Sequence, residues 1–184
     1  MYVEIWVEKD ALAGVIRDIT DPYDVPLMPT RGYPSLSFLS SAAETIQAIG
    51  KPTYLYYFGD HDPTGVNIPV TIERDLREFA PDADITFTKV GVTAQQIKDW
   101  NLPTRETKKT DPRIGNFEGD SAELDAIHPD TLRAMVRECI ERHIDRDALQ
   151  RLRMVEEQER QTLRNIRLQI LYERGATGDT EVQR

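Results

Sequence analysis

Cysteine is almost absent from this sequence of 184 residues, since Cys139 is the only one. A single thiol excludes a disulfide within the chain and a cysteine-rich zinc site. Long apolar runs are also absent, and no stretch approaches the roughly 18 residues that a membrane span needs. The amino terminus, MYVEIWVEKD, lacks the basic head and apolar core of a signal peptide. We therefore expect a cytoplasmic protein without a membrane partner.

Basic residues are in deficit, because 23 lysines and arginines stand against 32 aspartates and glutamates, a net charge of −9. Proteins that hold nucleic acid through phosphate contacts usually carry a net positive domain, so this balance argues against binding by a broad basic surface. Carboxylates gathered around divalent cations raise the negative count in another way, since the bound metal reverses the local charge. The charge balance therefore leaves a metal-dependent site open.

Short β-branched and aromatic runs alternate with segments of helical periodicity along the first 145 residues. This alternation predicts a Rossmann-like α/β fold, a mostly parallel sheet with helices on both faces. Right-handed crossovers place the carboxyl ends of all strands at one edge, where open α/β sheets bind ligands. The predicted strands lie within residues 3–7, 24–32, 53–58, 85–90 and 122–127, and the predicted helices within 9–19, 34–50, 69–80, 93–100 and 129–144.

The sequence divides into a domain over residues 1–145 and an extension. Within the domain, residues 101–120 are polar and rich in proline and glycine, which predicts a loop. Residues 146–174 predict a long charged helix with an interrupted apolar stripe, and residues 175–184 predict a flexible tail. The stripe is compatible with packing on the domain itself, with a partner protein or with a homodimer contact. It consists of Leu149, Leu152, Val155, Leu163, Ile166 and Ile170.

Acidic residues follow two of the predicted strands. The apolar run in YLYYFGDHDPTG ends in Asp60 and Asp62, whose side chains point to one side of an extended chain while that of His61 points to the other. Glu8 follows the first strand, which commonly lies beside the third in such sheets. Two like charges about 4 Å apart repel by about 4 kcal/mol at an effective dielectric near 20, so a proton or a cation must neutralise them. Oxygen ligands favour Mg²⁺, with Mn²⁺ as a substitute, and predict metal-assisted phosphoryl transfer.

The segment VEIWVEKDAL, followed at a distance by YLYYFGDHDPTG, resembles the Toprim domain, which has a glutamate after its first strand and Asp-x-Asp after its third. FGDHDPTG and the turn in TRGYPSLSFL are most similar to the version in the topoisomerase VI A subunit group. The resemblance implies that Glu8 is the general acid or base and that Asp60 and Asp62, with Glu8, hold Mg²⁺. It makes nucleic acid the expected partner, DNA more than RNA. The candidates for phosphate contacts are Lys9, Arg31, Lys108 and Lys109.

Topoisomerase VI A subunits place a winged-helix domain with a nucleophilic tyrosine before the Toprim domain, whereas this sequence begins at the first Toprim strand. We therefore expect a nuclease-like hydrolase that uses activated water, or the Toprim part of a topoisomerase-like protein. Two alternatives stay open. DHDPT also fits the Asp-x-Asp-x-Thr motif of haloacid-dehalogenase-type phosphatases, with Asp60 as nucleophile and Asp62 as general acid. The other alternative is a non-catalytic interaction module, in which the aspartates only organise a turn.

Overall fold

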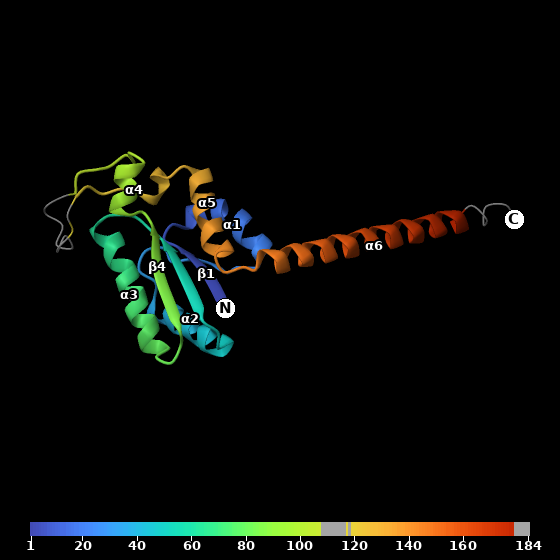
Figure 1. Cartoon of the computed structure of the whole chain (residues 1–184), viewed down its shortest axis with the longest axis horizontal. Coiled ribbons are helices and arrows are strands. Elements are labelled where there is room, and N and C mark those ends of the chain that lie inside the picture. Colours follow the sequence, from blue (N-terminus) through green and yellow to red (C-terminus); the bar gives the residue numbers. More distant parts are fainter. Residues whose placement is uncertain (108–116, 118, 179–184) are drawn as a thin grey trace. The chain divides into compact units, whose positions relative to one another are not determined.

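The computed structural model describes residues 1–107, 117 and 119–178 of the chain. The chain separates into two compact units, Met1–His143 and Ile144–Arg184. Figure 1 shows that all strands belong to the first unit and that the second is helical. The first unit has its own sheet and its own buried core, so the candidate site is built within it.

Four strands form the sheet: β1 (Tyr2–Val7), β2 (Leu27–Pro29), β3 (Thr53–Phe58) and β4 (Ile85–Gly91). They pair in the order β2-β1-β3-β4, and every pairing is parallel. The two central strands are almost entirely apolar and aromatic, as expected for parallel strands that are covered on both faces. The predicted α/β fold with a parallel sheet is confirmed.

Helices cover both faces of this sheet (Figure 1): α1 (Asp10–Thr20), α2 (Leu36–Ile49), α3 (Pro63–Phe79) and α5 (Pro129–Glu141). The helices α2 and α3 pack against each other and against Trp6, Leu55 and Tyr57 on one face. The helices α1 and α5 pack against each other on the opposite face, to which Ile5 and Val7 point because side chains alternate along a strand.

Shorter elements connect these layers. They are the 3-10 turns η1 (Asp21–Tyr23) and η2 (Leu124–Ala126) and the helix α4 (Ala94–Asp99). A capping box begins α4: the hydroxyl of Thr93 accepts the N–H of Gln96 at 3.2 Å, and Oε1 of Gln96 accepts the N–H of Thr93 at 2.9 Å. The cap fixes the direction in which the chain leaves β4.

The prediction of a fifth strand over residues 122–127 is wrong. The chain makes one isolated antiparallel bridge at Ala122 and then turns into η2. The alternation that predicted a strand has another cause, because Leu124 is fully buried while Glu123 and Asp125 on either side of it are ion-paired carboxylates. The segment brings charge to the edge of the sheet instead of extending it.

Helix α3 begins earlier than the helix predicted over 69–80. Asp62 caps it, and Pro63 lies in its first turn, where a missing N–H costs nothing. Pro69 therefore lies inside the helix rather than near its start. A proline at this place leaves the carbonyl of Gly65, four residues earlier, without its helical hydrogen bond. The Gly65 carbonyl instead accepts a hydrogen bond from Nζ of Lys89 on β4 at 2.9 Å.

The second unit is a single long helix, α6 (Arg146–Gly178). It covers the helix predicted over 146–174 and continues into the predicted tail, whose residues 179–184 lie outside the described part. Its large apolar side chains are exposed, as Leu152 at 55% and Leu163 at 65% show. No helix among the described residues is both long and apolar enough to cross a membrane.

Candidate active site

The carboxyl ends of β1 and β3 lie side by side in the middle of the sheet. Val7 pairs with Phe58, and the N–H of Glu8 donates to the carbonyl of Phe58 at 2.8 Å. The chain leaves β1 toward β2 and leaves β3 toward β4, so the direction of the strand order reverses here. Open α/β sheets bind their ligands at such a switch point. Glu8 and Asp60 follow the ends of these two strands.

Glu8 reaches from the end of β1 to the end of β3. Its Oε2 accepts the backbone N–H of Asp60 at 3.0 Å and the hydroxyl of Tyr57 at 3.3 Å. Gly59 makes room for the carboxylate, because a Cβ there would lie 2.6 Å from the same oxygen. Burial raises the pKa of Glu8, and the charges of Asp60 and Asp62 add to this, while the N–H of Asp60 opposes it. A carboxyl group with a raised pKa is suited to proton transfer near neutral pH.

Asp60 is the most enclosed of the three predicted carboxylates, with 9% of the residue exposed. Its Oδ1 accepts the backbone N–H of Leu124 at 2.8 Å, and its Oδ2 lies 3.4 Å from Nζ of Lys9. Burial raises the pKa of Asp60, whereas the N–H of Leu124 and the charge of Lys9 lower it. Asp60 thereby ties η2 to the end of β3.

Asp62 is held by a different contact. Its Oδ1 accepts the backbone N–H of Gly65 at 2.6 Å, which makes Asp62 the cap of α3. A Cβ at Gly65 would collide with the backbone of Asp60, so the turn that carries both aspartates requires glycine. Strand β3 ends at Phe58, so the alternation of side chains along a strand does not apply to Asp60 and Asp62. Their directions are set by separate hydrogen bonds, to the N–H of Leu124 and to the N–H of Gly65.

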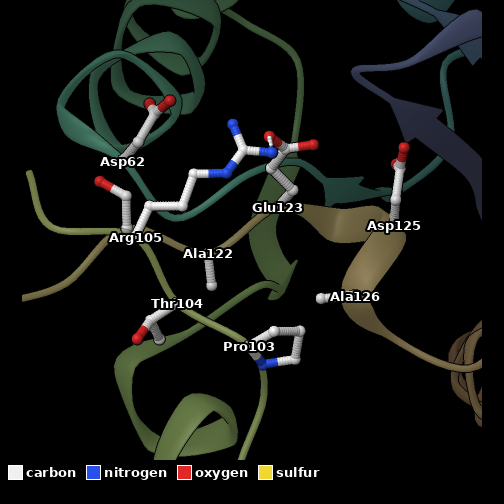
Figure 2. Close-up of a pocket in the computed structure, with 9 residues that line it drawn as sticks. Asp62, Pro103, Thr104, Arg105, Ala122, Glu123, Asp125 and Ala126 are labelled. Carbon is white, nitrogen blue, oxygen red and sulfur yellow. Dashed lines mark ion pairs between the residues drawn. The ribbon is translucent and has the colours of Figure 1, made fainter.

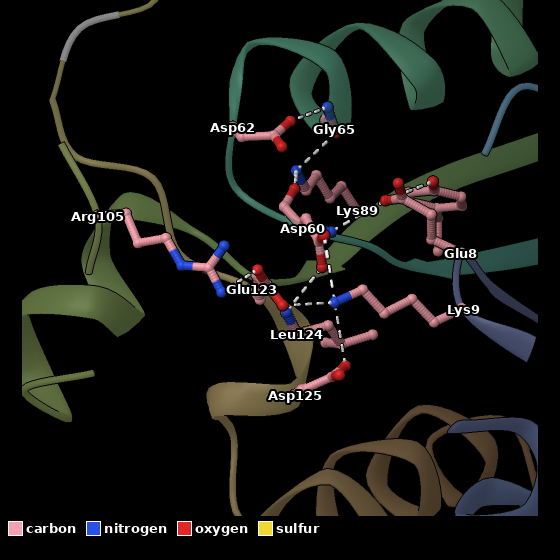
Figure 3. A network of polar contacts seen from close by, with 11 residues as sticks. Glu8, Lys9, Asp60, Asp62, Gly65, Lys89, Arg105, Glu123, Leu124 and Asp125 are labelled. Carbon is pink, nitrogen blue, oxygen red and sulfur yellow. Dashed lines mark hydrogen bonds and ion pairs between the residues drawn. The ribbon is translucent and has the colours of Figure 1, made fainter. Parts of the chain in front are cut away.

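Lys89 on β4 is a partly buried cation beside this turn (Figure 3). Its Nζ donates to the carbonyls of Asp60 at 2.8 Å and Gly65 at 2.9 Å. The Gly65 carbonyl is the one that Pro69 leaves without a helical donor, so the lysine replaces the missing N–H. Burial lowers the pKa of Lys89 to about 8, against the opposing effect of the neighbouring carboxylates.

Sequence reasoning missed Lys89. In the sequence it is one polar residue of the predicted strand ITFTKV. Its hydrogen bonds go to backbone carbonyls, and contacts to the backbone leave no sequence motif. Pro69 is the available signal, because a proline within a helix frees the carbonyl four residues before it.

Lys9 connects Asp60 to the segment around η2 (Figure 3). Its Nζ lies 3.0 Å from Oε2 of Glu123, 3.2 Å from Oδ1 of Asp125 and 3.4 Å from Oδ2 of Asp60. The other oxygen of Glu123 pairs with Arg105 at 2.6 Å. Positive and negative groups therefore alternate from Asp60 to Arg105. Glu123 and Arg105 were not predicted, and the acidic stretch GDSAELD is the only signal that points to this segment.

An open pocket of about 360 Å³ adjoins these charges. Figure 2 shows Arg105 extending across it toward Glu123, with Asp62 on the side of α3 and Asp125 on η2. Thr104 adds a hydroxyl group to the lining. The pocket lies beside the carboxylates and offers charged and hydrogen-bonding groups, which suit a polar ligand better than an apolar one.

The remaining predicted phosphate contacts are less defined. Arg31 forms an exposed ion pair with Asp10 at 2.9 Å and lies at the end of β2, on the same edge of the sheet. Lys108 and Lys109 lie outside the described residues. The described residues of the predicted loop around them include no helix or strand apart from the isolated bridge at Arg105. The roles of these basic residues stay predictions.

The predicted ligands supply only carboxylate oxygens, the donors that Mg²⁺ prefers. One oxygen of each carboxylate accepts a backbone N–H, which fixes its orientation. The second oxygen of Asp60 already lies 3.4 Å from the Lys9 ammonium. Among the described residues, no group of three or more His, Cys, Asp or Glu side chains is arranged to hold a metal ion. Mg²⁺ does not need such a cage, since it usually binds one or two carboxylates and keeps several waters. The donor set therefore fits Mg²⁺ by its chemistry.

No protein-family model matches this sequence, and no curated protein matches it significantly. The resemblance to the Toprim domain thus stays a prediction from the motifs around Glu8, Asp60 and Asp62. The parallel sheet agrees with that resemblance, but Rossmann-like folds host many unrelated functions. A function must therefore be inferred from the residues of the site.

Proposed function

We propose that this protein acts on phosphodiester bonds of nucleic acid with Mg²⁺ or Mn²⁺ as its cofactor, as a nuclease-like Toprim protein or the Toprim part of a topoisomerase-like one. One observation carries the proposal: Glu8 and Asp60 reach the switch point from adjacent strands, and the Glu8 carboxylate accepts the N–H of Asp60. Burial raises the pKa of both groups even with the Lys9 ammonium 3.4 Å from Asp60, so a further cation would favour their joint ionisation. The motif resemblance favours DNA over RNA as the substrate.

Glu8 is the proposed general acid or base. Its raised pKa keeps a proton available closer to neutral pH, and two donors, the Tyr57 hydroxyl and the N–H of Asp60, hold its orientation. Asp60 and Asp62 are the proposed ligands of the cation, which when bound would stabilise negative charge that develops on phosphate oxygens. Lys9 is the proposed phosphate contact nearest to Asp60.

The first test is calorimetric titration of Mg²⁺ and Mn²⁺ into the wild type and the double variant Asp60→Asn/Asp62→Asn. We expect the double variant to bind the ions at least tenfold more weakly. The chain offers a matched control in Asp82 and Asp84, two exposed aspartates with the same spacing that precede β4 at the opposite end of the sheet. Asp82→Asn/Asp84→Asn should bind like the wild type. Equal binding by all three proteins would reject the metal-dependent site.

The second test is cleavage of labelled single- and double-stranded DNA and RNA with and without Mn²⁺. We expect metal-dependent cleavage that Glu8→Gln reduces by about 10²-fold or more, the usual contribution of a general acid or base. Cleavage that is unchanged in Glu8→Gln would remove Glu8 from the mechanism. Turnover of small phosphomonoesters alone would favour the phosphatase hypothesis, and metal binding without any turnover would favour the interaction module.

The exposed helix α6 is the proposed contact for a partner protein or a second copy of the chain. A cytoplasmic location is part of the same proposal, on the sequence grounds given above. Mass measurement by light scattering over a range of concentrations tests the homodimer. A mass of one chain at all concentrations would exclude self-association.

A further inference from the structure

The ammonium group of Lys9 lies among three carboxylates at the switch point. Asp60 comes from the end of β3, whereas Glu123 and Asp125 come from the segment of η2. All three contacts to Nζ fall between 3.0 and 3.4 Å. The lysine side chain is 26% exposed, so it is held within the edge and does not extend freely into solvent.

These contacts keep Lys9 charged. Three carboxylates within 3.4 Å of Nζ, one of which accepts a hydrogen bond from it at 3.0 Å, favour the ammonium form of the side chain. The carboxylates benefit in turn, because three like charges around one point repel strongly unless a cation lies between them. Lys9 is therefore the resident counter-ion of this part of the edge.

Sites that use two divalent ions place them about 3.5–4 Å apart. The Asp60 and Glu123 carboxylates are linked through the Lys9 ammonium, whose Nζ lies 3.4 Å from the first and 3.0 Å from the second, while the backbone N–H of Asp60 donates to Glu8. A second ion on the Glu123 side of Asp60 would need the place where Nζ of Lys9 lies. The ammonium group and a second metal ion exclude each other there.

We propose that this protein binds a single divalent ion and that the Lys9 ammonium takes the place of a second one between Asp60, Glu123 and Asp125. The inference rests on the proposed function, because it concerns the number of ions that the proposed site takes. It gives Lys9 a role beyond a phosphate contact: it supplies a fixed positive charge on the side of Asp60 that faces the pocket residue Glu123.

The test is the number of Mn²⁺ ions bound per chain, counted by equilibrium dialysis and by the loss of the electron paramagnetic resonance signal of free Mn²⁺. We expect one ion for the wild type and two for Lys9→Met, which removes the ammonium and leaves its three carboxylates. Lys9→Arg retains the charge and should bind one. Lys98→Met, a substitution on the exposed part of α4, is the matched control and should also bind one.

The outcomes separate the inference from the proposed function. No ion bound by the wild type would reject both. Two ions in the wild type would reject the inference alone, and this count does not depend on how any variant folds. If the wild type and a folded Lys9→Met each bind one ion, Lys9 does not limit the number of bound Mn²⁺ ions. This result would also reject the inference. Loss of the second ion in Lys9→Met/Glu123→Gln would locate it at Glu123.

Discussion

Two regions of this protein are rich in charge, and they hold it in opposite ways. At the carboxyl edge of the sheet, Asp60 is buried and Lys89 donates to two backbone carbonyls. Along α6, charged side chains are exposed, and so are large apolar ones such as Leu163. Exposed charges interact weakly because water screens them, whereas buried charges shift the pKa of their neighbours. The edge is therefore where substitution of a single residue should have large effects.

The edge also contains a tight backbone contact at Gly65. Gly65→Ala should destabilise the first unit more than any other single substitution at this edge, by about 1–3 kcal/mol or more, because the new Cβ would press on the backbone of Asp60. Urea unfolding measures the loss. Gly14→Ala in α1 is the control, since a Cβ there meets nothing within 4 Å and should stabilise the helix by about 0.5–1 kcal/mol. Similar effects of both substitutions would contradict the tight turn.

Lys89→Met tests the partly buried cation at the same turn. It leaves two carbonyls without their donor, at a cost of about 1–3 kcal/mol for an unpaired buried group. The loss depends on pH. The pKa of Lys89 is about 8 in the folded protein and 10.5 in the unfolded chain, so the unfolded chain binds more protons between these values and the contribution of Lys89 to stability increases as the pH rises. Unfolding of both proteins at pH 7 and pH 10 should give the larger difference at pH 10.

Pro69 provides an internal control for this explanation. In Pro69→Ala the helix regains an N–H that can donate to the Gly65 carbonyl, so Lys89→Met should cost about 1 kcal/mol less in that background. Purely additive effects of the two substitutions would show that the lysine does not replace the missing helical donor.

The part of this edge that could be predicted from the sequence is the part that depends on topology. The alternation of strands and helices placed Glu8 and Asp60 at one edge, because all carboxyl ends of a parallel sheet meet there. The direction of the Asp62 side chain depends on its hydrogen bond to the N–H of Gly65. The turn that residues 122–127 form in place of a strand depends on the hydrogen bond from the N–H of Leu124 to Asp60. Those contacts exist only after the chain has folded, and no spacing in the sequence records them.

Lys89 and Glu123 illustrate the same limit. Each looks ordinary in its own segment, and each acquires its partners from a segment far away in the chain: Lys89 from the turn after β3, and Glu123 from Lys9 after β1. The charge of a residue can be read from the sequence. Whether that charge is buried and paired requires the three-dimensional arrangement.

Glu8→Gln should stabilise the first unit at neutral pH in metal-free buffer. Burial raises the pKa of Glu8 above its ordinary 4.5, so its contribution to stability is present below that value and is lost as the pH rises through the folded pKa. Glutamine cannot ionise and retains an oxygen for the donors Tyr57 and Asp60. We expect a thermal midpoint a few degrees higher than the wild type at pH 7 and no difference at pH 4. A lower midpoint at pH 7 would show that the ionised carboxylate stabilises the fold.

Ending the chain after Asp145 should have the smallest effect, although it removes far more atoms than any substitution above. The first unit has a core of its own, and the described side chains of α6 are exposed almost throughout. The shortened chain should therefore keep the thermal midpoint of the wild type and its Mn²⁺ affinity, both measured at low protein concentration. If removal of α6 lowers the midpoint only at high concentration, the helix stabilises an assembly. If it lowers the midpoint at every concentration, α6 packs on the domain, and the contrast between the two charged regions no longer holds.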